Sequence, residues 1–400
     1  MDELGKMNVN VVRYMNEFRN VLSYATNIGF FFGAGTSCAF GLPNIVRLTD
    51  NVKKSLSQQG ECILLFENAE KCVKDLSKKS QITIEDVLNH VREIRDLTNG
   101  RENYEFNGIT GAQASELDKA ICSAIFEDIR NAMKNVNLLE LRRFFAWYEA
   151  VNRDFIKEIY TTNYDMLLEM AMEANRVPYF DGFTGSYEPF FSSESVDSFP
   201  NENDSTSKWI RLWKIHGSLN WMKKSVTDYS EERIIRVANI DCPDNELMIY
   251  PSREKYNLSR REPYIAYFDR LKKYLNRGNL VFIVSGYSFG DEHINEFIFN
   301  ALKSNSRLYV IVLCYNDNQV EYMEKYASSC INLCVMGPEK VIVNGVMKIW
   351  TYDNSEDKDI GAGMYWQDDK FILGDFKSLI NFLIENSGRK NIIEEIANAK

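Results

Sequence analysis

Five short, mostly apolar runs occur along the chain, and small or polar residues follow each of them. The runs are Ile28–Phe32, Phe155–Tyr160, Ile210–Ile215, Leu280–Val284 and Leu308–Leu313. Apolar runs of this length, bounded by turn-forming residues, are typical of strands that are buried on both faces. Helical patterns follow several of the runs, so the sequence predicts an α/β fold with a mainly parallel sheet covered on both sides.

Much of the remaining chain carries apolar residues at steps of three and four, the spacing of amphipathic helices. A helix is predicted before the first strand at Val11–Thr26, and another is expected after Pro43. The other predicted helices are Ile63–Leu76, Ile84–Leu97, Ala112–Val136, Leu138–Val151 and Met166–Ala174. Asn99–Ile109 and the Ser- and Asp-rich residues 191–208 are predicted to be loops, the second of them solvated and a candidate for disorder.

These patterns divide the chain into three parts. Residues 1–44 and 152–335 are expected to form the sheet domain, and residues 45–151 a helical insertion. Residues 336–400 are expected to contain a hairpin at Lys340–Tyr352 and two terminal helices, packed on the core or extending it. We assign no chemical role to this last part.

Composition narrows the class of protein. Of 400 residues, 45% are hydrophobic and 13% aromatic, which fits a chain with a substantial core and excludes a disordered one. The net charge of −10 argues against strong nucleic-acid binding by phosphate neutralisation. The longest apolar runs fall well short of the ~20 residues of a membrane span, and the acidic first ten residues lack an apolar signal region. We therefore expect a soluble, cytoplasmic protein.

The eight cysteines include no C-x-x-C pair, and the chain has only three histidines. A structural zinc ion needs four thiolate or imidazole ligands, so no metal site is predicted. The cysteines are expected to be reduced and mostly buried.

The first strand runs into a glycine-rich turn, Gly33-Ala34-Gly35-Thr36-Ser37. A strand, a glycine turn and a helix allow backbone amides to approach a phosphate, because a Cβ atom would keep the backbone away from the ligand. Alone, the motif fits an ordinary tight turn equally well, since Cys38 stands where the usual dinucleotide fingerprint has its third glycine. The chain contains no P-loop motif of its own.

Polar residues also end the other strands, and in parallel sheets ligands bind beyond the carboxyl ends. The ordered motifs at these ends resemble those of the sirtuin (SIR2) family. They are Gly33–Ser37 with Gly41-Leu42-Pro43, Thr162-Asn163-Tyr164-Asp165, His216-Gly217 and Gly286-Tyr287-Ser288. The resemblance covers roughly residues 25 to 320, with the helical block as an insertion.

The resemblance implies a Rossmann-like domain that binds NAD and breaks its nicotinamide–ribose bond. The turn residues Gly33, Ala34, Gly35, Thr36 and Ser37 would cradle the pyrophosphate. Gly286, Tyr287 and Ser288 would lie on the adenosine side, and Asn316 would contact a ribose. Asp165 would hold the nicotinamide carboxamide, while Asn163 and His216 would flank the nicotinamide ribose as the catalytic residues.

The residue types suit this chemistry. Cleavage proceeds through an oxocarbenium-like transition state, and nicotinamide leaves as a neutral molecule, so no strong general acid is needed. Asn163 can hold a water or a ribose hydroxyl without adding charge. A histidine, with an ordinary pKa near 6.5, can accept a proton at neutral pH, which suits His216.

Each of these residues also has a structural interpretation. His216 could be a satisfied structural histidine, as we expect for His90 on its amphipathic helix. Asn163 and Asp165 could serve only to start the helix that follows them. We leave Asp291 and His293 out of the catalytic set, because Asp291 has the sequence position of a helix N-cap.

Two departures from protein-deacylating sirtuins favour hydrolysis. Those enzymes usually carry a zinc module with paired C-x-x-C motifs, and they have Asp-Phe-Arg where this chain has Asn44-Ile45-Val46. Without the zinc module that frames a peptide groove, water is the natural nucleophile. The expected activity is that of an NAD glycohydrolase yielding nicotinamide and ADP-ribose, with NAD as the substrate and no zinc.

Lys214–Trp221 and Ser285–Asp291 look like segments of SIR2-domain proteins from bacterial anti-phage defence systems. This likeness implies a homo-oligomer, gated activity that depletes NAD, and a HerA-type hexameric ATPase as partner. Two other functions stay open. One is NAD-dependent protein deacylation, which would form O-acyl-ADP-ribose. The other is a non-catalytic nucleotide-sensing subunit of an oligomer.

Overall fold

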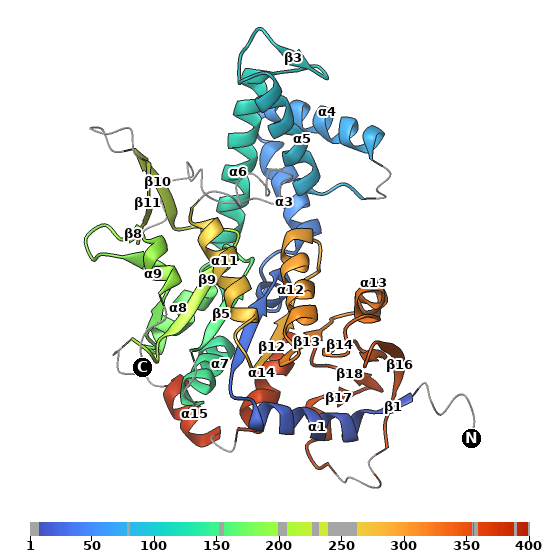
Figure 1. Ribbon diagram of the computed structural model, residues 1–400. Coiled ribbons are helices and arrows are strands. Elements are labelled where there is room, and N and C mark those ends of the chain that lie inside the picture. Colours follow the sequence, from blue (N-terminus) through green and yellow to red (C-terminus); the bar gives the residue numbers. More distant parts are fainter. Residues whose placement is uncertain are drawn as a thin grey trace.

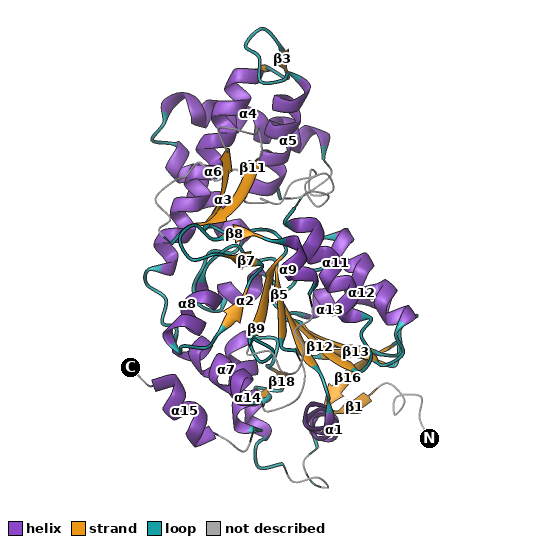
Figure 2. Ribbon diagram, turned by 60° about the vertical axis from the view of Figure 1, so that its left-hand side comes forward, coloured by secondary structure: helices purple, strands orange, loops and turns teal. Residues whose placement is uncertain are grey.

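The computed structural model describes residues 8–77, 81–151, 156–198, 206–225, 232–238, 262–353, 355, 359–387 and 390–398. The molecule is a mixed α/β protein built on one large, mostly parallel sheet (Figures 1 and 2). The predicted fold class is therefore confirmed.

Ten strands form the central sheet in the order β1-β16-β15-β14-β13-β12-β2-β5-β9-β6. Their bounds are β1 Asn8–Asn10, β2 Ile28–Phe32, β5 Glu158–Thr161, β6 Tyr179–Phe180, β9 Ile210–Lys214, β12 Leu280–Ser285, β13 Leu308–Leu313, β14 Leu333–Met336, β15 Lys340–Val343 and β16 Val346–Thr351. The strands from β14 to β6 pair in parallel, and only β15 pairs antiparallel, with both of its neighbours.

The order of the parallel strands creates a switch point beside β2. From β2 the chain passes to β5 and β9 on one side, and later to β12, β13 and β14 on the other. This is the doubly wound arrangement in which ligands bind at the carboxyl edge, where the direction of winding reverses.

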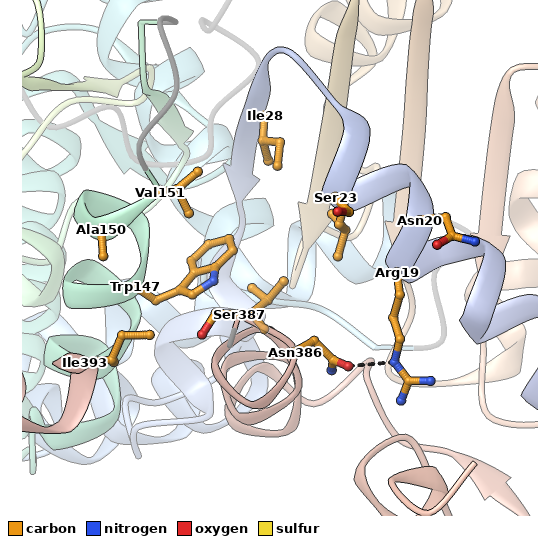
Figure 3. A pocket seen from close by; sticks show the side chains of 12 residues that line it. Arg19, Asn20, Ser23, Ile28, Trp147, Ala150, Val151, Asn386, Ser387 and Ile393 are labelled. Carbon is orange, nitrogen blue, oxygen red and sulfur yellow. Dashed lines mark hydrogen bonds between the residues drawn. The ribbon is translucent and has the colours of Figure 1, made fainter. Parts of the chain in front are cut away.

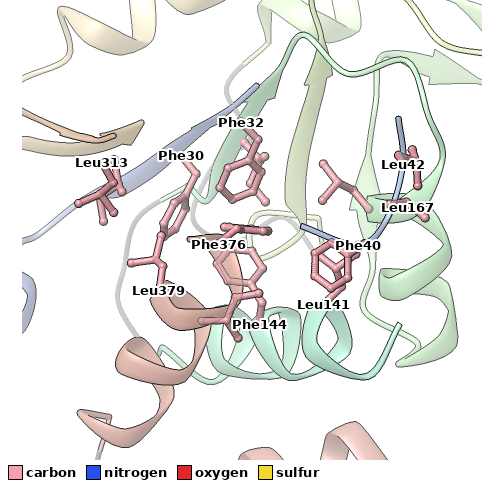
Figure 4. Close-up of a cluster of buried hydrophobic side chains, with 14 of the residues drawn as sticks. Phe30, Phe32, Phe40, Leu42, Leu141, Phe144, Leu167, Leu313, Phe376 and Leu379 are labelled. Atoms are coloured by element: carbon pink, nitrogen blue, oxygen red, sulfur yellow. The ribbon is translucent and has the colours of Figure 1, made fainter. Parts of the chain in front are cut away.

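Alternating residues of the central strands face two separate cores. On one face Phe30 and Phe32 pack with α7 (Leu139–Ala150) and α14 (Phe376–Glu385), as Figure 4 shows through Phe144 and Phe376. The same core includes side chains of α1 (Val11–Tyr24), α8 (Leu167–Ala174) and α15 (Lys390–Asn398). On the other face Phe31 packs into a core with α11 (Tyr264–Leu275), α12 (Glu292–Ser304) and α13 (Asp317–Ala327).

A group of helices extends beyond the carboxyl edge of the sheet, at the top of Figure 1. It contains α3 (Ile45–Leu56), α4 (Gly60–Leu76), α5 (Ile84–Leu97) and α6 (Gly111–Met133). The helices predicted within 45–151 are confirmed, and α3 begins after Pro43 with Asn44 as its N-cap. The last of them, α7, packs on the sheet with the C-terminal helices, so the domain boundary at residue 151 stays a prediction.

Two predicted loops contain regular structure. Asn99–Ile109 includes the two-residue strand β3 (Glu105–Phe106), which pairs with β4 (Ile109–Thr110). Within 191–208, α9 (Ser193–Asp197) forms because Ser192 caps it and Val196 is fully buried. Residues 199–205 of that segment lie outside the described residues.

A smaller antiparallel sheet stands beside the central one. It consists of β7 (Phe183–Thr184), β8 (Phe190–Phe191), β10 (Trp221–Ser225) and β11 (Glu232–Arg236). The predicted C-terminal hairpin is confirmed as β15 and β16, and the two terminal helices as α14 and α15. Between them lie the 3₁₀ turn η2 (Ala362–Met364) and the hairpin of β17 (Trp366–Gln367) and β18 (Lys370–Phe371).

Candidate functional site

The glycine turn after β2 packs directly against the turn after β12. Gly33 N donates to Ser285 O at 3.0 Å, and Gly35 N donates to Gly286 O at 2.8 Å. A Cβ added at Gly33 would lie 2.5 Å from Gly286 O, and one at Gly35 would lie 2.7 Å from Gly286 Cα. The glycines are thus required by contact between two backbone turns, a reason that the motif alone did not reveal.

The turn leads straight into the five-residue helix α2 (Ala34–Cys38). Ala34 and Gly35 are exposed, whereas Thr36 and Ser37 are buried. Thr36 Oγ1 donates to Gly33 O at 2.8 Å, so this hydroxyl stabilises the turn from within. The exposed part of the turn is therefore the Ala34–Gly35 backbone.

Asn163 follows β5 and points back to this turn. Its Nδ2 lies 3.0 Å from Gly33 O, 3.1 Å from Thr36 Oγ1 and 2.8 Å from Ser37 Oγ. Its Oδ1 has no hydrogen-bond partner within the described part of the chain. The interpretation of Asn163 as a helix cap is wrong, because α8 begins at Leu167 and the side chain that accepts from Leu167 N is that of Asp165.

Asp165 caps the helix that follows it and also contacts the glycine turn, while its predicted hold on the nicotinamide carboxamide stays a prediction. Its Oδ1 accepts a hydrogen bond from Leu167 N at 3.0 Å and so caps the start of α8. Its Oδ2 accepts from Ser37 Oγ at 2.6 Å. Ser37 therefore connects Asp165 to Asn163, and the three side chains form one hydrogen-bonded network.

His216 lies at the same edge of the sheet. Thr161 of β5 pairs with Lys214 of β9, so Asn163 and His216 each stand two residues beyond paired positions. Beyond the strands, Ile215 N donates to Thr161 O and Leu219 N to Tyr164 O, each at 2.9 Å. The backbones that carry the two predicted catalytic residues therefore run side by side.

His216 Nε2 contacts Asp291 Oδ2 at 3.1 Å, and both side chains are buried. Asp291 is the N-cap of α12, as the sequence indicated, and its Oδ1 accepts from His293 N at 3.1 Å. Sequence reasoning missed its second contact. The available signal was its position shortly after a strand that ends at the same edge as β9.

The other predicted nucleotide contacts differ in exposure. Tyr287 is buried, and its hydroxyl donates to Asp291 O at 3.2 Å, whereas Ser288 is exposed. Asn316 caps α13, with Oδ1 accepting from Gln319 N at 3.1 Å. Their contacts with a nucleotide stay predictions.

Two buried ion pairs connect the strands and helices next to the carboxyl edge of the sheet. Lys214 Nζ lies 2.8 Å from Glu169 Oε1 and donates to Asp165 O at 2.5 Å. Burial raises the pKa of the Glu169 carboxyl, although Lys214 acts in the opposite direction. At the start of β5, Glu158 pairs with Arg270 at 2.5 Å and also accepts from Trp213 Nε1. These pairs join β5, β9, α8 and α11.

A cavity of about 410 Å³ lies at the opposite, amino end of β2, where Ile28 lines it (Figure 3). Its other lining residues are Arg19, Asn20, Leu22, Ser23, Trp147, Ala150, Val151, Leu383, Asn386, Ser387 and Ile393. None of the predicted site residues lines it.

The arrangement of the cysteines and of possible metal ligands can be compared with the prediction. Among the described residues, no cluster of three or more His, Cys, Asp or Glu side chains could hold a metal ion. Seven cysteines are free thiols, three of them buried and four partly exposed, so "mostly buried" was too strong; Cys242 lies outside the described residues. Burial and the nearby Asp165 raise the pKa of the Cys38 thiol, which disfavours a thiolate at the turn. Of the helices that are described, none combines the length and apolar character needed to cross a bilayer.

Comparison with known proteins gives information on residues 157–331, which include Asn163 and His216. A search of the curated proteins found no match to the chain. Residues 157–331 match a protein-family model described as a SIR2-like domain. The matched segment contains Asn163, Asp165, His216, Asp291 and Asn316, but not the glycine turn at Gly33–Ser37. Residues 157–331 are therefore similar to a SIR2-like domain, which agrees with the resemblance of the strand-end motifs and suggests a function related to NAD.

Proposed function

We propose that this protein is an NAD glycohydrolase. Water attacks C1′ of the nicotinamide ribose, the C1′–N bond breaks, and nicotinamide, ADP-ribose and one proton are released. The observation that carries the proposal is the hydrogen-bonded network of Asn163, Ser37 and Asp165 on the glycine turn, with His216 on the adjacent strand end.

The hydrogen bonds of Asn163 give it a specific role. Because Nδ2 is committed to the turn, Oδ1 is the atom that would accept a hydrogen bond from the attacking water. A neutral amide orients water without adding charge beside the developing oxocarbenium ion. His216 would take the proton that the water loses.

The glycine turn fits the diphosphate of NAD in one respect. Ala34 and Gly35 are exposed at the carboxyl edge, next to Gly286, so a ligand can reach this part of the turn.

The biological setting rests on the resemblance of Lys214–Trp221 and Ser285–Asp291 to anti-phage SIR2 proteins. On that basis we propose a cytoplasmic homo-oligomer that depletes NAD during phage infection. A free NAD hydrolase would harm its own cell, so we also propose that a HerA-type ATPase or the oligomer itself gates the activity.

The test is NAD turnover by purified protein, alone and with a coexpressed HerA-type ATPase, with nicotinamide and ADP-ribose quantified by chromatography. Asn163→Ala and His216→Ala should each lower turnover by about 10²- to 10⁴-fold, the usual contribution of a positioned acid–base or orienting group. His90→Gln is the matched control: this histidine lies on α5 in the helical group, burial lowers its pKa, and its replacement should leave turnover unchanged.

Circular dichroism establishes that each variant is folded. Unchanged turnover in folded Asn163→Ala and His216→Ala would overturn the assignment. Formation of O-acyl-ADP-ribose from an acylated peptide, in place of plain ADP-ribose, would instead identify a deacylase.

A further inference from the structure

The segment from Gly286 to Asp291 crosses the carboxyl edge of the sheet. It leaves β12, yet Asp291 contacts His216 at the end of β9, three positions away in the sheet order. At a strand spacing of about 4.8 Å, that separation is about 14 Å. The segment passes the end of β2, where Gly286 contacts the glycine turn, and the Asp291 and His216 side chains bridge the rest of the separation.

The crossing segment is held in one conformation by several contacts. Gly286 packs on the glycine turn, and the Tyr287 ring lies 4.8 Å from the rings of both Phe31 and Phe289. Phe289 has φ of 57°, a conformation that is unfavourable for an aromatic residue. Its carbonyl accepts from Asn295 Nδ2 at 2.8 Å, and its ring is buried, so packing maintains the strained backbone.

The two carboxylate oxygens of Asp291 have different partners. Oδ1 accepts from the backbone amide of His293 at the start of α12, which fixes the carboxylate plane. Oδ2 consequently faces His216 Nε2. A carboxylate only accepts hydrogen bonds, so Nε2 carries the proton in the neutral ring, and Nδ1 is the nitrogen that can accept one.

We propose that Asp291 is a positioning residue, which sets the tautomer and orientation of His216 and stabilises the imidazolium formed when His216 takes a proton. This inference rests on the proposed NAD hydrolysis. Because Asp291 reaches His216 from the far side of the switch point, the contact also ties the β12 half of the sheet to the β9 half.

The decisive variant is Asp291→Asn. Asparagine caps helices as well as aspartate does, so Oδ1 should keep its contact with His293 N and the fold should be retained. Its NH₂ group must then face His216 Nε2, a donor where the wild-type chain has an acceptor. The ring is forced into the tautomer that is protonated on Nδ1, and kcat should fall by about 10²- to 10⁴-fold with KM little changed.

Two measurements separate this role from a purely structural one. The first is the ¹⁵N spectrum of histidine-labelled protein. With only three histidines in the chain, His216→Ala identifies the His216 signals. Wild type should show a protonated Nε2 on His216, and Asp291→Asn a protonated Nδ1. The second is the matched control Asp375→Asn, which alters the N-cap of α14 at Ser378 N and should leave kcat unchanged.

The outcomes are distinct. A wild-type kcat in Asp291→Asn, or a wild-type His216 protonated on Nδ1, would overturn the role of Asp291 while leaving NAD hydrolysis intact. Wild-type protein that releases no nicotinamide under any partner condition would overturn the proposed function. In that case the tautomer measurement still decides whether Asp291 fixes the imidazole.

Discussion

The two ends of strand β2 have opposite characters. At its carboxyl end, turns and side chains are joined by directed hydrogen bonds, from Gly33 to Ser285 and from Asn163 to Ser37. At its amino end, Ile28 borders a cavity of about 410 Å³ between α1, α7, α14 and α15 (Figure 3).

The cavity at the amino end of β2 does not have the richer chemistry. The guanidinium group of Arg19, at the cavity, is committed to Asp359 and Asn386, each at 2.6 Å. The carboxyl end instead gathers an imidazole, two carboxylates and an amide with an available oxygen. Chemical function follows such groups and their orientation, and a cavity at the other end of the strand does not by itself mark the site.

Gly286→Ala should produce the largest effect, because it breaks the contact between the two turns. Gly286 has φ of 67°, and an added Cβ would overlap Thr36 N and lie 2.8 Å from the Gly35 carbonyl carbon. Positive φ and overlap with backbone together should destabilise the fold by about 2–6 kcal/mol. Turnover should fall by more than about 10²-fold, since the turn also positions Asn163.

Gly60→Ala is the matched control for this prediction. Gly60 begins α4, and an added Cβ there would meet nothing within 4 Å. Chemical denaturation and NAD turnover should both stay close to wild type in this variant. A Gly286→Ala protein with wild-type stability and turnover would show that the close approach of the two turns is unimportant.

Lys214→Met should have the next largest effect, and mainly on stability. The substitution leaves Glu169 buried without its cation, and removing one partner of a buried pair is unfavourable by about 3–5 kcal/mol. It also removes the donor to Asp165 O, so turnover should fall too.

The double variant Lys214→Met/Glu169→Leu distinguishes charge burial from lost packing. Replacing both members of a buried pair by apolar residues is often close to neutral. Urea unfolding should therefore show that the double variant recovers much of the stability lost by Lys214→Met. No recovery would mean that the Lys214 contact with Asp165 O, rather than the uncompensated charge, is what matters.

The strands and most helices could be predicted from the sequence because their signals are local. Ile28–Phe32 and Leu308–Leu313 are unbroken apolar runs, and both are strands with the predicted bounds. The short helix α9 was missed because its formation depends on the tertiary burial of Val196.

The site was only partly predictable, because some of its contacts also depend on tertiary structure. Motif order indicated which residues lie at strand ends, and parallel pairing brings Asn163 and His216 to one edge. The contact of Asp291 with His216 depends on how the segment after β12 crosses that edge, which no local pattern encodes. Likewise, the glycine motif gave no sign that its closest neighbour is the backbone of Gly286.

Lys157→Met tests the amino end of the sheet, and its expected effect is the smallest of the three. Lys157 precedes β5, at the amino edge, and its Nζ donates to Glu149 O at 2.8 Å. Burial lowers the pKa of Lys157 from 10.5 to about 8, with Glu149 acting in the opposite direction.

The sign of the pH dependence follows from this lowered pKa. Between pH 8 and 10.5 the unfolded chain keeps the Lys157 proton that the folded protein has released. The unfolded state then binds more protons, so this residue makes the free energy of unfolding rise with pH, by on the order of 1–3 kcal/mol across the window.

Tyrosines also titrate near the upper end of this pH window, so the informative quantity is the difference between wild type and Lys157→Met in urea unfolding at several pH values. The variant should lack the rise, and its NAD turnover at neutral pH should match wild type, because the amino end contributes stability and no chemistry. An identical pH dependence in the two proteins would show that Lys157 is solvated, and a loss of turnover would contradict the division of roles between the two ends of β2.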